Sequence, residues 1–196
     1  MNQLIFATNN QHKVDEVKSL LAGILDVISL KDADIDIDIP EPHDRLEENA
    51  DEKSRCIYAR TGKNCFSEDT GLEVEALQGA PGVRSARYCT VDEPFKSNTE
   101  KLLFQLNNVS NRKAQFRTVI SLVLNGDIHQ FEGICEGKIS TTESGNQGFG
   151  YDPIFIPTGS ERSFAEMTMS EKNKFSHRQK AVSKLIAFLQ HRYGQN

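Results

Sequence analysis

Two acidic residues, Glu68 and Asp69, are adjacent in the segment 66–71, which reads Phe-Ser-Glu-Asp-Thr-Gly. Adjacent carboxylates repel each other unless a cation or a water pathway offsets their charge. Magnesium suits such a position, because it prefers carboxylate and water oxygens and is often held by one or two carboxylates together with substrate phosphates. Glu41, which follows a run of alternating Asp and Ile residues, supplies a further carboxylate. These acids are either magnesium ligands or ordinary surface residues.

Asp69 is a stronger candidate for chemistry than Glu68. Thr70-Gly71 predicts a turn that aims the Asp69 carboxylate inward. A strand neighbour such as Glu68 is expected to point the opposite way, because side chains alternate along a strand. Of these acids, Asp69 is therefore the first candidate for a metal ligand.

The polar segment Thr8-Asn9-Asn10-Gln11-His12-Lys13 lies where a predicted strand ends and a helix begins. A helix N-terminus presents unpaired N–H groups and a partial positive charge, and Lys13 adds a full charge on the first turn. Phosphate would be stabilised there. The alternative is that Asn9 or Asn10 only caps the helix and that Lys13 is a solvent-exposed charge.

Two further clusters lie in the last third of the chain. In the segment 145–153, glycines bracket aromatic residues, so the backbone can approach a ligand while the rings offer a stacking surface and Asp152 can bond a base edge. A turn with two core aromatic residues explains the same pattern. His177 and Arg178 follow Ser176 at the start of the last predicted helix, where positive charge opposes the helix dipole. Either a bound ligand or a partner carboxylate accounts for these cations.

Hydrophobic periodicity, capping residues and turn residues predict the elements that must position these motifs. Asp44 and Glu47 have the spacing of a capping box, and Asn125-Gly126 is a hairpin signal. Strands and helices alternate at first and strands follow each other later, which predicts an α/β fold around a mixed sheet. We expect strands at 3–7, 34–39, 65–67, 115–124 and 128–139, and helices at 12–21, 45–60, 93–106 and 177–192.

The composition excludes several classes of protein. The 196 residues include 23 basic and 28 acidic side chains, for a formal net charge of −5, without the basic stripe of a protein that binds a nucleic acid polymer. The four cysteines form no C-x-x-C pair, so no zinc ribbon or redox motif is indicated. The N-terminus does not read as a signal peptide, and no apolar stretch is long enough for a membrane span. We expect a soluble, cytoplasmic protein.

Five motifs follow one another along the chain: T-N-N-x-x-K, S-E-D-T-G-L-E-V-E-A-L, G-A-P-G-V-R-S-A-R-Y, G-F-G-Y-D-P-I-F, and S-F-A-E-M with E-K-N-K-F-S-H-R. Their order resembles the inosine triphosphate pyrophosphatase family, the Ham1-like or RdgB-like noncanonical purine NTP pyrophosphatases. The resemblance spans essentially the whole chain. It implies an α/β fold with a long central mixed β-sheet flanked by helices. It also implies one domain of two lobes with a nucleotide cleft between them, usually assembled as a homodimer.

The resemblance implies hydrolysis of ITP, dITP or XTP to the monophosphate and pyrophosphate, with Mg²⁺ as cofactor. Asp69 would accept the proton of the attacking water and bind the metal beside Glu41. The triphosphate would be bound by Thr8, Asn9, Asn10, Gln11, His12, Lys13 and Lys53. The remaining substrate contacts would come from Thr70, Phe149, Gly150, Tyr151, Asp152, Lys172, His177 and Arg178.

Donors from His177 and Arg178 suit the O6 atom of a 6-oxo purine, whereas the amino group of adenine would leave them unpaired at about 1–3 kcal/mol each. The chain departs from the family pattern at Glu68, where Asp is usual, at Arg84, where Tyr is common, and after Glu41, where an acid-Thr-Gly is common. Two other functions fit the same residues. One is a pyrophosphatase of related fold for other modified nucleotides, and the other is a nucleotide sensor without turnover.

Overall fold

The computed structural model describes residues 3–193, whose strands form one mixed sheet in the order β2-β1-β3-β5-β6-β7, with β4 paired to β3. This confirms the predicted α/β class, a mixed sheet flanked by helices. The strands are β1 (Gln3–Phe6), β2 (Asp26–Ser29), β3 (Cys65–Val74), β4 (Pro81–Gly82), β5 (Lys113–Leu124), β6 (Asp127–Ile139) and β7 (Phe155–Pro157). The helices are α1 (Gln11–Leu21), α2 (Leu46–Thr61), α3 (Asn98–Gln105), α4 (Met169–Asn173) and α5 (His177–Tyr193).

The chain divides into two compact units, each with its own hydrophobic core. Strands β3, β5 and β6 contribute residues to both units. Unit 1 contains the described residues of Met1–Asp69, Thr118–Gly133 and Arg178–Asn196, and unit 2 contains Thr70–Arg117 and Ile134–His177.

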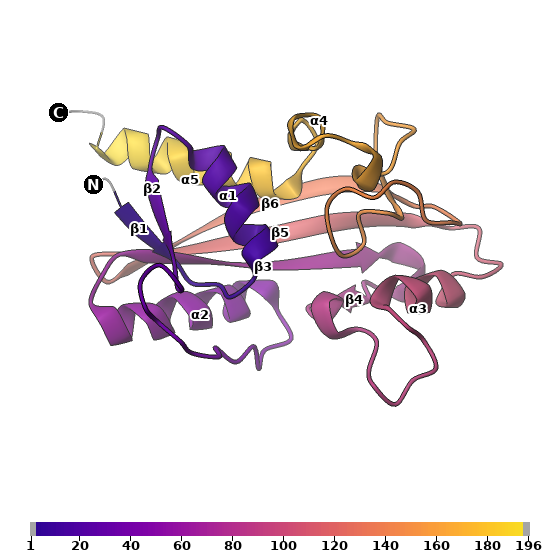
Figure 1. The fold of residues 1–196 in the computed structure, drawn as a ribbon, viewed down its shortest axis with the longest axis horizontal. Coiled ribbons are helices and arrows are strands. Elements are labelled where there is room, and N and C mark those ends of the chain that lie inside the picture. Colours follow the sequence, from indigo (N-terminus) through magenta and orange to yellow (C-terminus); the bar gives the residue numbers. More distant parts are fainter. Residues whose placement is uncertain (1–2, 194–196) are drawn as a thin grey trace. The chain divides into compact units, whose positions relative to one another are not determined.

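In unit 1, helices cover both faces of β1, which pairs in parallel with β2 and β3. Helices α1 and α5 lie on one face, and α2 lies on the other (Figure 1). Because side chains alternate along a strand, Leu4 and Phe6 pack with α1 and α5, while Ile5 packs with Ile57 of α2. The continuous apolar run at the start of the chain is thus a strand buried on both faces.

The ends of the unit 1 helices follow local chemistry. Asn10 caps α1, since its side chain accepts a hydrogen bond from the Lys13 N–H at 3.3 Å. Gly62 ends α2 at a φ of 65°, a left-handed conformation that glycine adopts without a Cβ clash. The predicted buried stripe of α5 is also confirmed, because Ala181, Val182 and Leu185 are all buried.

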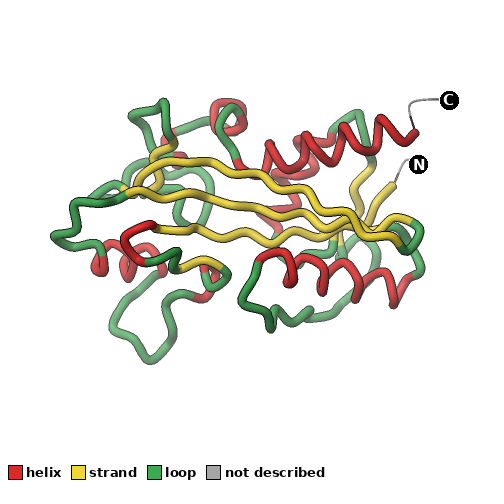
Figure 2. Tube along the Cα trace, turned by 180° about the vertical axis from the view of Figure 1, so that it is seen from behind, coloured by secondary structure: helices red, strands yellow, loops and turns green. Residues whose placement is uncertain are grey.

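Strands β5 and β6 form the long hairpin that the sequence predicts (Figure 2). The two turn residues between them, Asn125 and Gly126, have φ angles of 53° and 94°. Positive φ at both central residues is the type I′ geometry that matches the right-handed twist of paired strands, and Asn-Gly favours it.

Unit 2 has an aromatic core on its part of the sheet. The Phe116 ring of β5 lies 4.7 Å from the Phe155 ring of β7 and 6.2 Å from the Phe164 ring, between centroids. Leu102 of α3 and Tyr151 belong to the same cluster. The aromatic segment 148–155 therefore contributes to packing as well as to any ligand site.

The predicted strand at 34–39 is wrong, because none of those residues is in a strand. The strand beside β1 is instead β2, which the sequence analysis missed. Ile35, Ile37 and Ile39 still pack partly buried against the unit 1 core, while the alternating aspartates are exposed. The two-residue period was therefore set by burial on one side and not by pairing with a neighbouring strand.

The predicted turn at Thr70-Gly71 is also wrong, because β3 continues from Cys65 to Val74. Gly71 serves packing within unit 2: a Cβ at this position would lie 2.7 Å from the carbonyl oxygen of Gly82 in β4. The lack of a side chain at Gly71 permits β3 and β4 to approach each other closely.

The predicted capping box of α2 and the predicted start of α3 are wrong as well. Helix α2 begins at Leu46 after Arg45, without a side-chain cap, so the Asp44 capping box does not form. Helix α3 begins at Asn98 and not at residue 93, because the Ser97 hydroxyl accepts the Glu100 N–H at 3.0 Å and so caps it there. Within residues 3–193, no helix is long and apolar enough to cross a membrane.

Candidate active site

Lys53 joins two carboxylates beside α2 in unit 1. Its Nζ donates to Glu41 Oε1 at 2.6 Å and to Asp69 Oδ1 at 2.9 Å. Lys53 and Asp69 are buried, and the Glu41 side chain is 26% exposed. These three residues form the acid–lysine cluster. The structure thus brings together three residues that the sequence analysis placed in the metal and phosphate sites.

Burial and charge both act on the ionisation of the acid–lysine cluster. Burial raises the pKa of Asp69 above its ordinary value, with Lys53 and Lys13 opposing and the Glu41 carboxylate adding to the rise. Burial would lower the pKa of Lys53, but the carboxylates of Asp69 and Glu41 outweigh it and raise that pKa. Lys53 therefore stays charged, and Asp69 is a stronger base than a surface aspartate, as proton transfer near neutral pH requires.

A second group of charges, the arginine cluster, lies where β3, α1 and α5 of unit 1 meet. It consists of Lys13, Glu16, Glu68 and Arg178. Arg178 donates from Nε and Nη2 to the two Glu68 oxygens, both at 2.8 Å, and from Nη1 to Glu16. Lys13 Nζ lies 3.3 Å from Glu68 Oε1. Two cations thus face two carboxylates, which compensates charges that are costly to bury.

The arginine cluster supplies the carboxylates that one of the two explanations of Arg178 requires. Its place in the first turn of α5 opposes the helix dipole, and the sequence left open whether a ligand or a carboxylate compensates it. Arg178 is 2% exposed, and its guanidinium group donates to Glu68 and Glu16. Burial acts to lower the pKa of Arg178, but the negative charge of Glu68 opposes burial and contributes most to raising that pKa. Partner carboxylates therefore account for the cation in this structure.

The phosphate-site segment of α1 is mostly exposed. Thr8 Oγ1 accepts the Asn10 N–H at 3.2 Å, and Asn9 Nδ2 donates to the Ile37 carbonyl at 2.8 Å. Gln11 bonds Asp15 within the helix. The capping role predicted for Asn9 or Asn10 belongs to Asn10, while Lys13 is not the freely solvated charge of that alternative. Burial lowers the pKa of Lys13, and the Glu68 carboxylate opposes this shift.

Unit 2 contains a buried ion pair that forms the Lys172 cluster with two aromatic rings. Lys172 Nζ donates to Asp152 Oδ2 at 2.8 Å and lies 5.3 Å from the Phe149 ring centroid and 5.4 Å from that of Phe164. The Phe149 N–H also donates to Asp152 Oδ2, at 2.9 Å. Gly148 is required beside it, because a Cβ there would lie 2.0 Å from Asp152 Oδ2. The glycine-rich segment therefore folds around the Asp152 carboxylate.

Two other predicted base-site residues lie in the packed interior of unit 2. Tyr151 is 4% exposed, and its hydroxyl donates to the Ser85 carbonyl at 3.0 Å. His177 is buried with its ring stacked on Phe116 at 4.7 Å and an interplanar angle of 15°. The predicted core role of an aromatic residue in this segment is confirmed for Tyr151, which belongs to the hydrophobic core.

With this geometry established, comparison with known proteins gives the family. The sequence matches the Ham1 family over residues 4–188. The chain belongs to the Ham1 family. The resemblance drawn from the five sequence motifs is confirmed.

Relatives in this family match nearly the full chain. A dITP/XTP pyrophosphatase of Christiangramia forsetii is 48% identical over 187 residues, which is 95% of this chain and 98% of that protein. A dITP/XTP pyrophosphatase of Porphyromonas gingivalis is 48% identical over 190 residues, covering 96% of this chain and 98% of that protein. The solved structure of the Staphylococcus aureus Ham1 protein has a TM-score of 0.86 and 36% identity, covering 97% of this chain and 100% of that one.

Sequence reasoning missed two polar residues of this Ham1 family protein that the clusters use. Glu16 lies three residues after Lys13 on α1, and Asn49 lies four residues before Lys53 on α2. Both spacings put side chains on one helix face, so helical periodicity was a signal that could have found them. Asn49 Nδ2 lies 3.4 Å from Asp69 Oδ2 as a hydrogen-bond donor.

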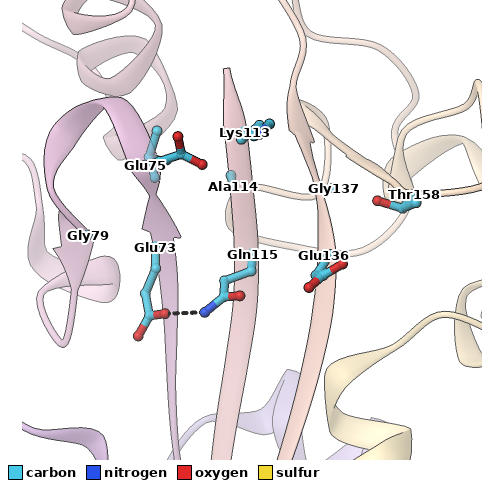
Figure 3. Close-up of a pocket in the computed structure, with 10 residues that line it drawn as sticks. Glu73, Glu75, Gly79, Lys113, Ala114, Gln115, Glu136, Gly137 and Thr158 are labelled. Atoms are coloured by element: carbon cyan, nitrogen blue, oxygen red, sulfur yellow. Dashed lines mark hydrogen bonds between the residues drawn. The ribbon is translucent and has the colours of Figure 1, made fainter. Parts of the chain in front are cut away.

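A separate pocket of about 580 Å³ lies in unit 2 between strands β3, β5 and β6. It is lined in part by Glu73, Lys113, Gln115 and Glu136, and Gln115 Nε2 donates to Glu73 at 2.6 Å (Figure 3). None of the predicted site residues of this Ham1 family member lines it. The pocket therefore lies outside the clusters described above.

Proposed function

We propose that this protein hydrolyses the noncanonical purine nucleoside triphosphates ITP, dITP and XTP to the monophosphate and pyrophosphate. The observation that carries the proposal is the acid–lysine cluster, in which a buried base candidate, Asp69, adjoins a second carboxylate and a phosphate-binding cation. Membership of the Ham1 family and the names of its relatives, dITP/XTP pyrophosphatases, support the same reaction.

Glu41 and Asp69 are the residues that would hold Mg²⁺. Their oxygens already converge on one cation, since both lie within hydrogen-bond distance of Lys53 Nζ, at 2.6 and 2.9 Å. Hard carboxylate oxygens are the donors that Mg²⁺ prefers. The described residues include no group of three or more His, Cys, Asp or Glu side chains set to hold a metal, so water and substrate phosphate would complete the ligands. When bound, Mg²⁺ neutralises charge on the phosphates.

Asp69 would accept the proton of the water that attacks the α-phosphorus. Its burial raises its pKa, which strengthens it as a base. Lys53 stays protonated beside it and would bind a phosphate oxygen, as would Lys13 and the first turn of α1 with Thr8 to His12. Thr70, the next residue after Asp69 in β3, would add a substrate contact.

The Lys172 cluster would recognise the base. Asp152 and Lys172 present an acceptor and a donor fixed against each other, and the Phe149 ring beside them offers a stacking face. Gly150, Tyr151 and His177 would complete this subsite. Arg178 would act through the arginine cluster, because its guanidinium group donates to Glu68 and Glu16.

The protein would act as a cytoplasmic homodimer on a small nucleotide and not on a nucleic acid polymer. The net charge of −5 and the absence of a basic stripe in the sequence support a small ligand. Light scattering after size-exclusion chromatography tests the dimer.

A steady-state assay across ITP, dITP, XTP, GTP, ATP and pyrimidine triphosphates tests the function. We expect monophosphate and pyrophosphate as products, with kcat/KM for ITP, dITP or XTP at least about tenfold above that for ATP. Chelation should stop turnover, and added Mg²⁺ should restore it. A preference for pyrimidines would favour the related pyrophosphatase, and binding without monophosphate would favour the sensor.

A further inference from the structure

Asn49 is a polar side chain in the interior of unit 1. It is the fourth residue of α2 and is 0% exposed. A buried amide costs free energy unless its donors and acceptor find partners. Its contacts therefore indicate why an amide occupies this position.

The three hydrogen bonds of the Asn49 side chain match the chemistry of an amide. Its Oδ1 accepts the His43 N–H at 2.9 Å, and its Nδ2 donates to the His43 carbonyl at 3.0 Å and to Asp69 Oδ2 at 3.4 Å. Two donor hydrogens and one acceptor are thus used by two backbone groups and one carboxylate. The reverse amide orientation would set NH₂ against the His43 N–H, so the pattern also fixes the orientation.

His43 lies two residues after Glu41, in a segment that forms neither strand nor helix. No ladder of backbone hydrogen bonds holds such a segment, so its place depends on bonds like those from Asn49. Asn49 itself is held by α2, which is bonded to β3 at the residue after Asn49. Ser67 of β3 donates to the Ala50 carbonyl.

We infer that Asn49 is a positioning residue that fixes the segment carrying Glu41 against Asp69. One side chain bonds the backbone beside Glu41 and one oxygen of Asp69, so it sets how far apart the two carboxylates lie. Lys53 then meets the other Asp69 oxygen and Glu41. The inference rests on the proposed function, because the separation matters only if both carboxylates serve one metal and one water.

Substitution of Asn49 separates this role from simple packing. Asn49→Asp keeps the volume but has no donor for His43 or Asp69, and it places a carboxylate beside Asp69. Asn49→Ala removes all three bonds. Ser54→Ala is the matched control, because Ser54 is a 0% exposed polar residue of the same helix that bonds Asp51 and Ser121 but neither His43 nor Asp69.

The experiment measures three quantities on the full chain: hydrogen exchange of the backbone amides of residues 41 and 43–45, Mn²⁺ binding by calorimetry without nucleotide, and kcat and KM for dITP. For both Asn49 variants we expect exchange to speed up about tenfold or more and kcat to fall about 10- to 100-fold. For Asn49→Ala, which adds no carboxylate, we expect Mn²⁺ affinity to fall about 10- to 100-fold as well. KM should change less than about threefold, because the phosphate and base contacts remain. Ser54→Ala should stay near the parent in all three.

Parent-like exchange and kcat in both Asn49 variants would overturn the inference. An equal loss in Ser54→Ala would overturn it too, because the effect would then be a general weakening of α2. If Asn49→Ala does not fold, Asn49→Asp decides by the same criteria. A parent protein that hydrolyses no nucleotide would defeat the proposed function, while hydrogen exchange and Mn²⁺ binding would still decide whether Asn49 fixes the segment and the metal site.

Discussion

Glu68 and Asp69 are consecutive residues of β3, yet their carboxylates meet different helices of unit 1. Glu68 accepts two hydrogen bonds from Arg178 of α5, and Asp69 accepts one from Lys53 of α2. The alternation of side chains along a strand produces this separation. It resolves the repulsion that two adjacent acids would suffer, because each carboxylate has its own cation. It also leaves Asp69 as the acid that adjoins Glu41.

Replacing Asp69 by Asn should remove the base while keeping the shape of the side chain. We expect kcat for dITP to fall about 100- to 10,000-fold, the usual contribution of a positioned general base. Pyrophosphate release in a steady-state assay measures it. Asp36→Asn, at an exposed position in the same unit, is the matched control and should keep the parent rate. Full activity in Asp69→Asn would show that another group takes the proton.

Replacing Glu68 by Gln should destabilise unit 1. Arg178 would lose the carboxylate that accepts two of its hydrogen bonds, and Lys13 would lose the carboxylate of its ion pair. Part of the buried positive charge would then have no compensating carboxylate. Breaking a buried pair in this way costs about 3–5 kcal/mol, whereas Glu48→Gln at an exposed position should change the free energy of unfolding by less than about 0.5 kcal/mol. Urea denaturation measures both. Equal stability of the two variants would mean that water reaches the arginine cluster.

Gly148→Ala should lower the stability of the protein by more than the strain of a left-handed backbone alone. Gly148 has a φ of 73°, and a new Cβ would lie 2.0 Å from Asp152 Oδ2. Gly23 has a φ of 75° with nothing within 4 Å of the same position, so Gly23→Ala carries the backbone strain without the clash. We expect the Gly148 variant to be about 1–3 kcal/mol less stable than the Gly23 variant by thermal unfolding. Equal values would show that Asp152 moves aside freely.

Asp32 should make stability depend on acid pH. A hydrogen bond from Lys18 at 2.7 Å, with further hydrogen bonds donated by Ser29, lowers the pKa of Asp32 to about 2. A carboxyl whose pKa is lower in the folded state stabilises the fold above its unfolded pKa of about 4, and this is lost as pH falls toward 2. The Tm of Asp32→Asn should therefore lie below that of the parent at pH 7 and approach it near pH 2. A gap that persists at pH 2 would indicate a packing effect.

Local patterns in the sequence determined the family, the class of fold and most of the elements. Buried stripes such as Ala181, Val182 and Leu185 and turn residues such as Asn125 and Gly126 specify their elements through short-range chemistry. The alternation of Glu68 and Asp69 across the strand was predictable for the same reason, although the turn invoked to explain it does not exist.

Tertiary structure decided which residues meet. Whether 34–39 pairs as a strand depended on β2 occupying the place beside β1, and whether Arg178 compensates a ligand or a carboxylate depended on Glu16 and Glu68, 162 and 110 positions away. The role of Asn49 depends on the tertiary structure, which places His43 and Asp69 within hydrogen-bond distance of its amide. Sequence patterns report the period of a helix or strand, whereas the partner of a buried charge is set by contacts between segments that the period does not encode.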